Sequence, residues 1–125
     1  YNIGIDYDVR DKRVRTWYGG EVVSSAKEYG YGDRIRIKTD VTYNYNETNY
    51  PVYTAYAHLA DRNYLNGSEV KVGDQVRAGQ DIGTQGNTGH SFGTHVDLQL
   101  WIEVNGRKIN VSPNALESQI KSSHP

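Results

Sequence analysis

The chain has 125 residues, which is enough for one compact domain and too few for two. It contains no cysteine, and this excludes a disulfide-built fold and any metal site with cysteine ligands. Lys and Arg number 14 and Asp and Glu number 15, so the net charge of −1 gives no electrostatic basis for binding nucleic acid. No stretch approaches the roughly 20 apolar residues that a transmembrane helix needs. We therefore treat residues 1–125 as a single domain.

Composition and periodicity both predict β structure. Eleven of the 14 aromatic residues are tyrosine, which suits half-buried strands, and 13 residues are glycine, which marks turns. Apolar and polar residues alternate with period two in short segments, whereas helical periodicity is nearly absent. Many short strands with frequent turn signals predict an all-β barrel or sandwich with at most one short helix.

The strand segments are predicted in chain order at residues 4–7, 14–17, 21–27, 34–39, 52–59, in short pieces within 70–82, and at 94–104 and 108–111. Strand 34–39 alternates charged and apolar residues, so one of its faces is expected to lie in water. Residues 8–13 predict a charged turn. Residues 43–50 (YNYNETNY) are polar and aromatic, and predict a hairpin tip or a projecting loop.

Turns and one helix complete the prediction. Residues 83–93 are rich in glycine and predict a loop before the strong strand 94–104. Asn105-Gly106 predicts a tight hairpin turn after that strand. Ser112 precedes a proline that fits the first turn of a helix, so residues 113–121 form the predicted helix.

Histidines and carboxylates are left to carry any chemistry. His58 ends strand 52–59, and His95 opens strand 94–104 directly after the glycine-rich loop. Rigid strands position a side chain, and a glycine-rich loop lets a ligand approach closely. His95 and Asp97 lie two residues apart and therefore on one face, where such a pair can hold a metal or orient a base. Asp6 ends the first strand. A purely structural role for these histidines stays open at this point.

Six motifs follow one another along nearly the whole chain. They are NIGID (2–6), GEVV (20–23), GYG (30–32), YAHL (56–59), VGDQVRAGQDIG (72–83) and GNTGHSFGTHVDL (86–98). In this order they resemble the M23 family of zinc metallopeptidases, the lysostaphin-like or LytM-type domains. The resemblance implies a β-rich barrel-sandwich with an open groove, cleavage of peptide cross-bridges in peptidoglycan, and an extracytoplasmic location. No signal segment is visible in the chain.

The resemblance also implies which residues form the site, and here the chain departs from the family. The family binds zinc through one aspartate and two histidines. Asp6 matches the aspartate, whereas Asn2 and Asp97 stand at the two histidine positions. His58 and His95 match the two histidines that act as acid/base or oxyanion-stabilising groups. Three oxygen ligands favour harder cations over zinc, so we expect little tightly bound metal.

Several functional hypotheses follow. The first is a degenerate domain that binds peptidoglycan, a glycine-rich peptide or a cell-wall hydrolase partner without efficient hydrolysis. The second is an active metallo-endopeptidase with an unusual metal site. One alternative for that site is a rearrangement of His58, His95 and either Asp6 or Asp97 around zinc, and another is a nitrogen ligand from His90. A biotinyl or lipoyl carrier domain shares the turns of residues 72–83, but residues 83–93 contain no lysine to modify.

Candidate partner-binding residues are His90 in the glycine-rich loop and the tyrosines Tyr43, Tyr50 and Tyr53. Exposed tyrosines stack on sugars or pack on peptides. The alternative is that these tyrosines shield the edge of the barrel.

Overall fold

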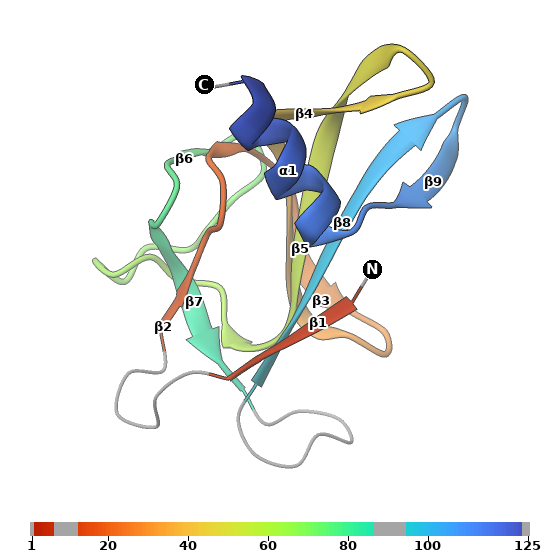
Figure 1. Cartoon of the computed structure of the whole chain (residues 1–125). Coiled ribbons are helices and arrows are strands. Elements are labelled where there is room, and N and C mark those ends of the chain that lie inside the picture. Colours follow the sequence, from red (N-terminus) through yellow and green to blue (C-terminus); the bar gives the residue numbers. More distant parts are fainter. Residues whose placement is uncertain (1, 7–12, 87–94, 124–125) are drawn as a thin grey trace.

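A computed structural model describes residues 2–6, 13–86 and 95–123 of the chain (Figure 1). The elements in chain order are β1 (Asn2–Asp6), β2 (Arg13–Arg15), β3 (Gly20–Glu28), β4 (Gly32–Tyr45), β5 (Thr48–Asp61), β6 (Gln75–Val76), β7 (Asp81–Gln85), β8 (His95–Val104), β9 (Arg107–Asn110) and α1 (Pro113–Ser123). The predicted all-β class with one short C-terminal helix is confirmed.

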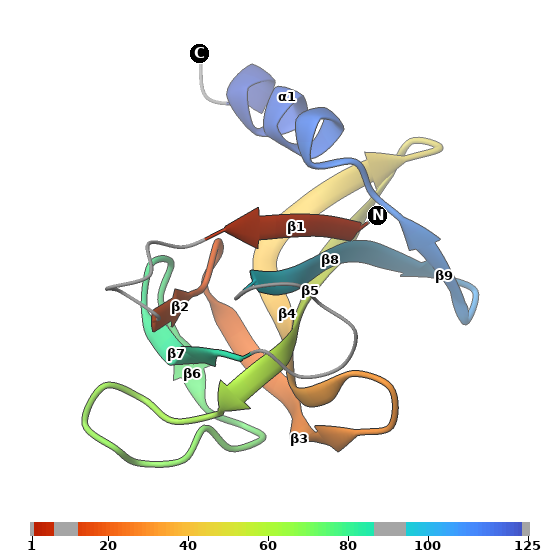
Figure 2. The ribbon, with the colours of Figure 1, turned by 90° about the horizontal axis from the view of Figure 1, so that it is seen from below.

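The strands form one antiparallel sheet that curls into an open half-barrel (Figure 2). Its main path runs β1-β8-β5-β4-β3-β6, with β9 added to β8 and with β7 joining β5 to β2. The strand β5 is central, because it pairs with β4, with β8 and, at its end, with β7.

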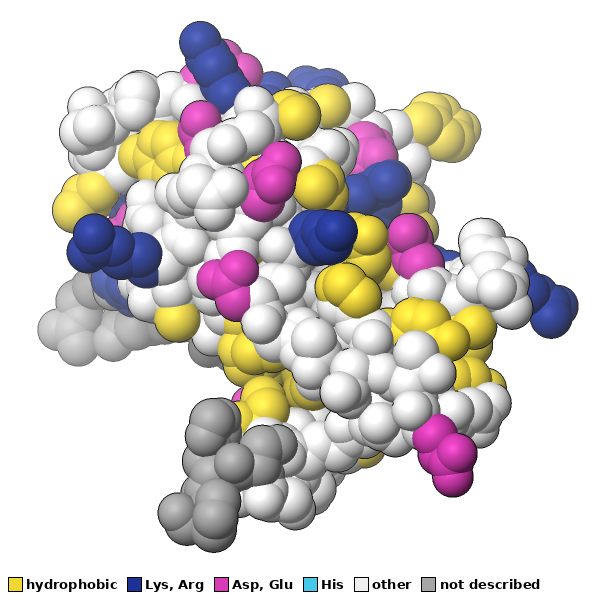
Figure 3. Space-filling view, turned by 90° about the horizontal axis from the view of Figure 1, so that it is seen from above, with side chains coloured by type: hydrophobic (Ala, Val, Ile, Leu, Met, Phe, Trp, Pro, Cys, Tyr) yellow, Lys and Arg dark blue, Asp and Glu magenta, His cyan; other side chains and the backbone are white. Residues whose placement is uncertain are grey.

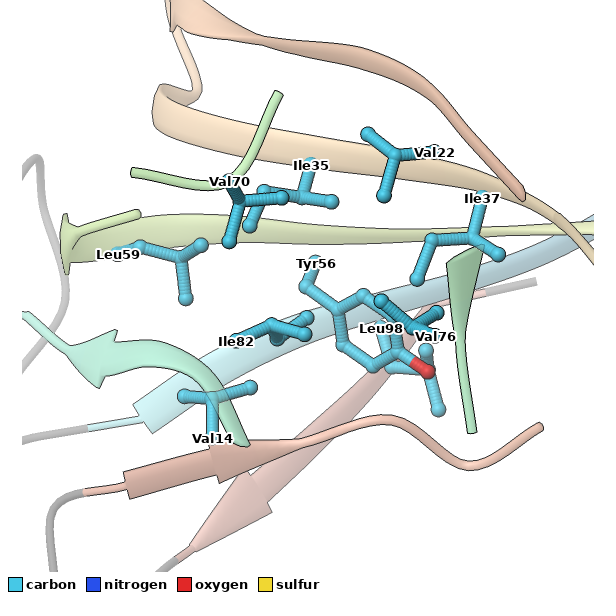
Figure 4. Packing of buried hydrophobic residues seen from close by; sticks show 10 residues of the cluster. All are labelled: Val14, Val22, Ile35, Ile37, Tyr56, Leu59, Val70, Val76, Ile82 and Leu98. Carbon is cyan, nitrogen blue, oxygen red and sulfur yellow. The ribbon is translucent and has the colours of Figure 1, made fainter. Parts of the chain in front are cut away.

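Two hydrophobic clusters fill the inside of this sheet. The first surrounds Tyr56 and contains ten buried residues from seven strands and one loop (Figure 4). The Tyr56 hydroxyl accepts a hydrogen bond from the backbone N–H of Trp17 at 2.8 Å, which satisfies its polar end inside the core. The second cluster joins Val52 and Leu100 to Leu116 of α1, so the helix packs against the sheet through this cluster.

The helix starts and ends much as predicted. Ser112 lies before its first turn and its carbonyl accepts the N–H of Leu116 at 3.0 Å, while the helix continues two residues beyond the predicted end at 121. No helix among the described residues is long and apolar enough to cross a membrane.

The segment 43–50 corrects the sequence prediction in part. It is a hairpin, but the projecting loop is wrong, because β4 extends to Tyr45 and β5 begins at Thr48. Only Asn46 and Glu47 form the turn, and both have positive φ angles of 50° and 66°. Two such residues make a tight two-residue turn whose twist matches the strands, so pairing continues to the tip.

Two other boundaries differ from the prediction. The first residues of the expected glycine-rich loop, 83–85, belong to β7. The remainder of that loop from residue 87, like the expected charged turn up to residue 12, lies outside the described residues.

Candidate functional site at the β5 bulge

The central strand β5 changes its partner at His58. Ala57 lies opposite Asp97 of β8, whereas Leu59 lies opposite a residue of β7. The ladder between β4 and β5 shifts register at the same place, which makes the segment a β-bulge. Bulges re-aim side chains and occur beside functional sites, so the predicted residue His58 lies where the sheet turns a corner.

The backbone of His58 is left-handed, with a φ of 61°. Its N–H donates to the carbonyl of Tyr31 at 2.8 Å, and its carbonyl accepts the N–H of Gly86 at 3.0 Å. This conformation costs a residue other than glycine about 1–2 kcal/mol. It persists only where the surroundings impose it, and such strained residues cluster at functional sites. The strain therefore marks His58 independently of any motif.

Gly86, the residue after β7, packs closely against the bulge. A Cβ at this position would lie 2.9 Å from the backbone nitrogen of Ala60 and 3.0 Å from the carbonyl oxygen of His58. Both neighbours are backbone atoms, so neither can move aside easily. Glycine at this position is thus required by the close approach of the two chains.

Side-chain contacts connect His58 through Tyr31 to Arg34 of β4. The Tyr31 and His58 rings lie 6.4 Å apart, and the Arg34 guanidinium lies 4.3 Å above the centre of the Tyr31 ring. Arg34 also donates to the amide oxygen of Gln99 at 2.8 Å and pairs with Glu28 at 3.3 Å.

Arg34 is an exception to the prediction that the charged face of this strand lies in water, since Lys38 is exposed and the Arg36 side chain is 39% exposed. The Arg34 side chain is only 5% exposed. The reason is local, because a tyrosine ring, an amide and a carboxylate cover the guanidinium together. A single-sequence pattern cannot show that these three groups meet there.

The register of β1, β8 and β5 positions the predicted metal-site residues. Asp6 lies opposite His95, and Asn2 lies opposite Gln99. Asp97 lies between β1 and β5, in register with the residue just before the β5 bulge. The backbone thus carries His95 and Asp97 on β8, the strand next to that of His58, and carries Asn2 and Asp6 one strand further on. The catalytic and ligand roles assigned to them stay predictions.

His90, the further nitrogen ligand predicted from the sequence, lies outside the described residues. Among the side chains that are described, no three His, Asp or Glu residues are grouped to hold a metal ion.

The three predicted partner-binding tyrosines separate into two environments. Tyr43 and Tyr50 lie opposite each other in the β4–β5 hairpin and pack, partly buried, against the second hydrophobic cluster. Tyr53 instead stacks on Trp101 of β8, with the ring centroids 5.7 Å apart. Partner binding through all three stays a prediction.

On the face seen in Figure 3, acidic, basic and hydrophobic side chains are interspersed, without an extended patch of one charge among the described residues.

Sequence reasoning missed a group of residues on β8 and β9 near Tyr53. Lys108 lies 4.4 Å above the Trp101 ring and donates to Gln99 at 3.4 Å. Burial, followed by the positive charges of Arg34 and Arg36, lowers the pKa of Lys108. One signal was available, since Gln99 and Trp101 occupy alternate positions of the strand that begins with His95.

The family model for peptidase family M23 matches residues 1–111, which is most of the chain and includes all these strands up to β9. The chain belongs to peptidase family M23. The resemblance predicted from the six motifs is therefore confirmed at the level of family and fold.

Solved M23 structures have the same fold. The antimicrobial peptidase lysostaphin from Staphylococcus simulans is 27% identical, with a TM-score of 0.67 over 94% of this chain and 44% of the lysostaphin chain. The catalytic domain of the prophage-encoded M23 protein EnpA from Enterococcus faecalis, solved as a mutant, is 27% identical, with a TM-score of 0.57 over 79% of this chain and 66% of that domain. A zinc-containing peptidase from Vibrio cholerae is 25% identical, with a TM-score of 0.51 over 74% and 24%. This M23 chain thus spans less than two thirds of the length of these proteins.

Proposed function

We propose that this M23 domain binds a glycine-containing peptide of the kind that cross-links peptidoglycan, without hydrolysing it efficiently. The observation that carries the proposal is the β1–β8 register, which lays Asn2, Asp6 and Asp97 along two neighbouring strands. By resemblance these are the three metal-ligand positions of the family. Two of them carry an amide and a carboxylate in place of imidazoles.

Zinc, the metal that the family implies, fits this set of residues poorly. Zinc sites in proteins are built mainly from imidazole and thiolate ligands, with carboxylates in the minority. Asn2, Asp6 and Asp97 offer oxygen alone, which suits calcium or magnesium. Three protein oxygens also fall well short of the six to eight ligands that calcium takes. Since tight metal binding is what brings the pKa of a bound water down to about 7, we expect little hydrolysis at neutral pH.

The residues that the chain keeps suit binding. His58 and His95 retain the family's positions for hydrogen bonds to a peptide carbonyl. At His58 the bulge fixes the backbone on both sides through Tyr31 and Gly86. A ligand residue without a Cβ can approach such a fixed backbone closely. The proposal places the domain outside the cytoplasm, where peptidoglycan is found, with a cell-wall hydrolase as the alternative partner.

The proposal is tested by restoring the missing imidazoles with the double substitution Asn2→His and Asp97→His. The parent is expected to contain little zinc when purified without chelator, and the variant is expected to bind zinc much more tightly in a titration. A matched control adds two imidazoles at exposed positions of β4 and β5 through Asp40→His and Asn49→His. This control is expected to leave zinc affinity at the level of the parent.

Two further measurements decide between binding and hydrolysis. An acetylated, amidated hexaglycine peptide is expected to bind the parent and remain intact, and peptidoglycan is expected to remain undigested. Chelator-sensitive digestion by the parent would instead establish an active endopeptidase. If the double variant binds zinc no better than the control, Asn2 and Asp97 do not occupy ligand positions.

A further inference from the structure

A row of cations crosses the sheet beside the proposed peptide site. Arg36 of β4, Ala55 of β5 and Gln99 of β8 lie in register across three neighbouring strands. Arg34 and Lys108 both donate to the same oxygen of Gln99, at 2.8 and 3.4 Å. Two positive side chains therefore meet at one neutral amide, and Arg36 lies in register with that amide across β5.

Their charges are only partly compensated. Arg34 and Arg36 share the single carboxylate of Glu28, at 3.3 and 2.6 Å. The Nε atoms of both arginines are buried without a hydrogen-bond partner. Lys108 contacts the neutral Gln99 and lies opposite Glu103 of β8. Three positive side chains thus face two carboxylates, and the remaining positive charge favours an anion as a neighbour.

An aromatic wall bounds the cluster on one side. Trp101 is 4% exposed and stacks on Tyr53 with an angle of 12° between the rings, while Lys108 covers the indole. The indole N–H points to Glu103 at 3.4 Å. Because Tyr53 and Lys108 cover the indole, Trp101 supports Lys108 from below, and the half-buried Tyr53 ring is the aromatic surface left for a peptide.

The cluster lies at a defined spacing from the proposed site. Ala55 is two residues before Ala57 on β5, and Ala57 immediately precedes the bulge at His58. Two residues along a strand correspond to about 7 Å, which is also the length of two residues in an extended ligand. A ligand with one residue beside Ala57, at the edge of the bulge, therefore reaches the cation row with its second neighbouring residue.

We propose that Arg34, Arg36 and Lys108 form a carboxylate subsite that selects peptides with an acidic residue two positions from the residue bound beside Ala57, at the edge of the bulge. This inference rests on the proposed peptide-binding function. It adds a preference for an acidic peptide to a domain whose ligand would otherwise be defined by glycine alone.

The experiment compares two hexapeptides, both acetylated and amidated, that differ only in Glu or Gln within a glycine background. The parent is expected to bind the Glu peptide about three- to fivefold more tightly, as fits a partly exposed charge pair. The preference is expected to shrink as sodium chloride is raised.

Variants assign the preference to the cluster. Lys108→Gln removes the charge while keeping the first two methylene groups and is expected to remove most of the preference, and Lys108→Glu is expected to invert it. Arg107→Gln, on the adjacent position of the same strand, changes charge equally and is expected to keep the preference. Thermal unfolding of each variant checks that the fold is retained.

Three results would overturn the inference. Equal binding of the Glu and Gln peptides by the parent removes the subsite but leaves the proposed function standing, whereas no binding of either peptide removes both. A preference that survives Lys108→Gln and Arg36→Gln places the selectivity elsewhere. Inorganic phosphate that binds as tightly as the Glu peptide would show a general anion site and no selection of peptides.

Discussion

The left-handed backbone at His58 leads to a prediction whose sign is unusual. Replacing this residue by alanine or by glycine removes the same imidazole and the same contact with Tyr31. The two variants then differ mainly in how well they tolerate a φ of 61°. Alanine keeps the left-handed penalty of about 1–2 kcal/mol, and glycine avoids it. Glycine in turn lowers the free energy of unfolding by roughly 0.5–1 kcal/mol relative to alanine, because its unfolded chain has more conformational freedom.

The expected net result is that His58→Gly is more stable than His58→Ala by up to about 1.5 kcal/mol, at some 3–5 °C in Tm per kcal/mol for a domain of this size. Urea unfolding of both variants, with equal m values, measures this difference. The same pair of residues at exposed Ala60, whose φ is not positive, provides the control. There glycine is expected to be the less stable residue. If glycine is less stable than alanine at position 58 by as much as it is at position 60, the backbone at His58 is not left-handed in solution.

Three more predictions concern the framework around the site. Gly86→Ala is expected to destabilise the fold by about 1–3 kcal/mol through overpacking against backbone, and to weaken peptide binding; unchanged urea midpoints would contradict the close approach. Tyr56→Phe leaves the Trp17 N–H without its partner and is expected to cost about 1–3 kcal/mol in the same assay, whereas a neutral result would show that water replaces the hydroxyl. Hydrogen bonds from the Lys71 N–H, and then from the Tyr64 hydroxyl, lower the pKa of Asp74 from its ordinary value of 3.8. The ionised carboxylate therefore stabilises the fold at pH values above 3.8, and this stabilisation is lost as pH falls through the folded-state pKa. The stability gap between the parent and Asp74→Asn is expected to close below that pH, and a gap that widens in acid would refute the assignment.

The sequence was most informative where local chemistry decides the structure. Ser112 and Pro113 mark the helix start, and alternating residues such as Ile35 and Ile37 mark the core face of β4. These features depend on the residue and its near neighbours alone. The motif order was also sufficient to identify the family.

The sequence was least informative where distant strands meet. The left-handed conformation of His58 is imposed by Tyr31 and Gly86, which lie 27 and 28 residues away. The buried guanidinium of Arg34 depends on Gln99, 65 residues further along the chain. A charged residue in an alternating strand normally indicates solvent, and only the register of three strands reverses that expectation.

The pairing of β1 has a consequence for dynamics. Among the described residues this strand of five residues pairs with β8 alone, and it stands at the end of the main sheet path. A short edge strand can detach by local unfolding at a free energy well below that of global unfolding. Such an opening would separate Asn2 and Asp6 from β8. A ligand that bridges β1 and β8 would oppose this opening, so amide hydrogen exchange in β1 would report on occupancy while the rest of the domain remained unchanged.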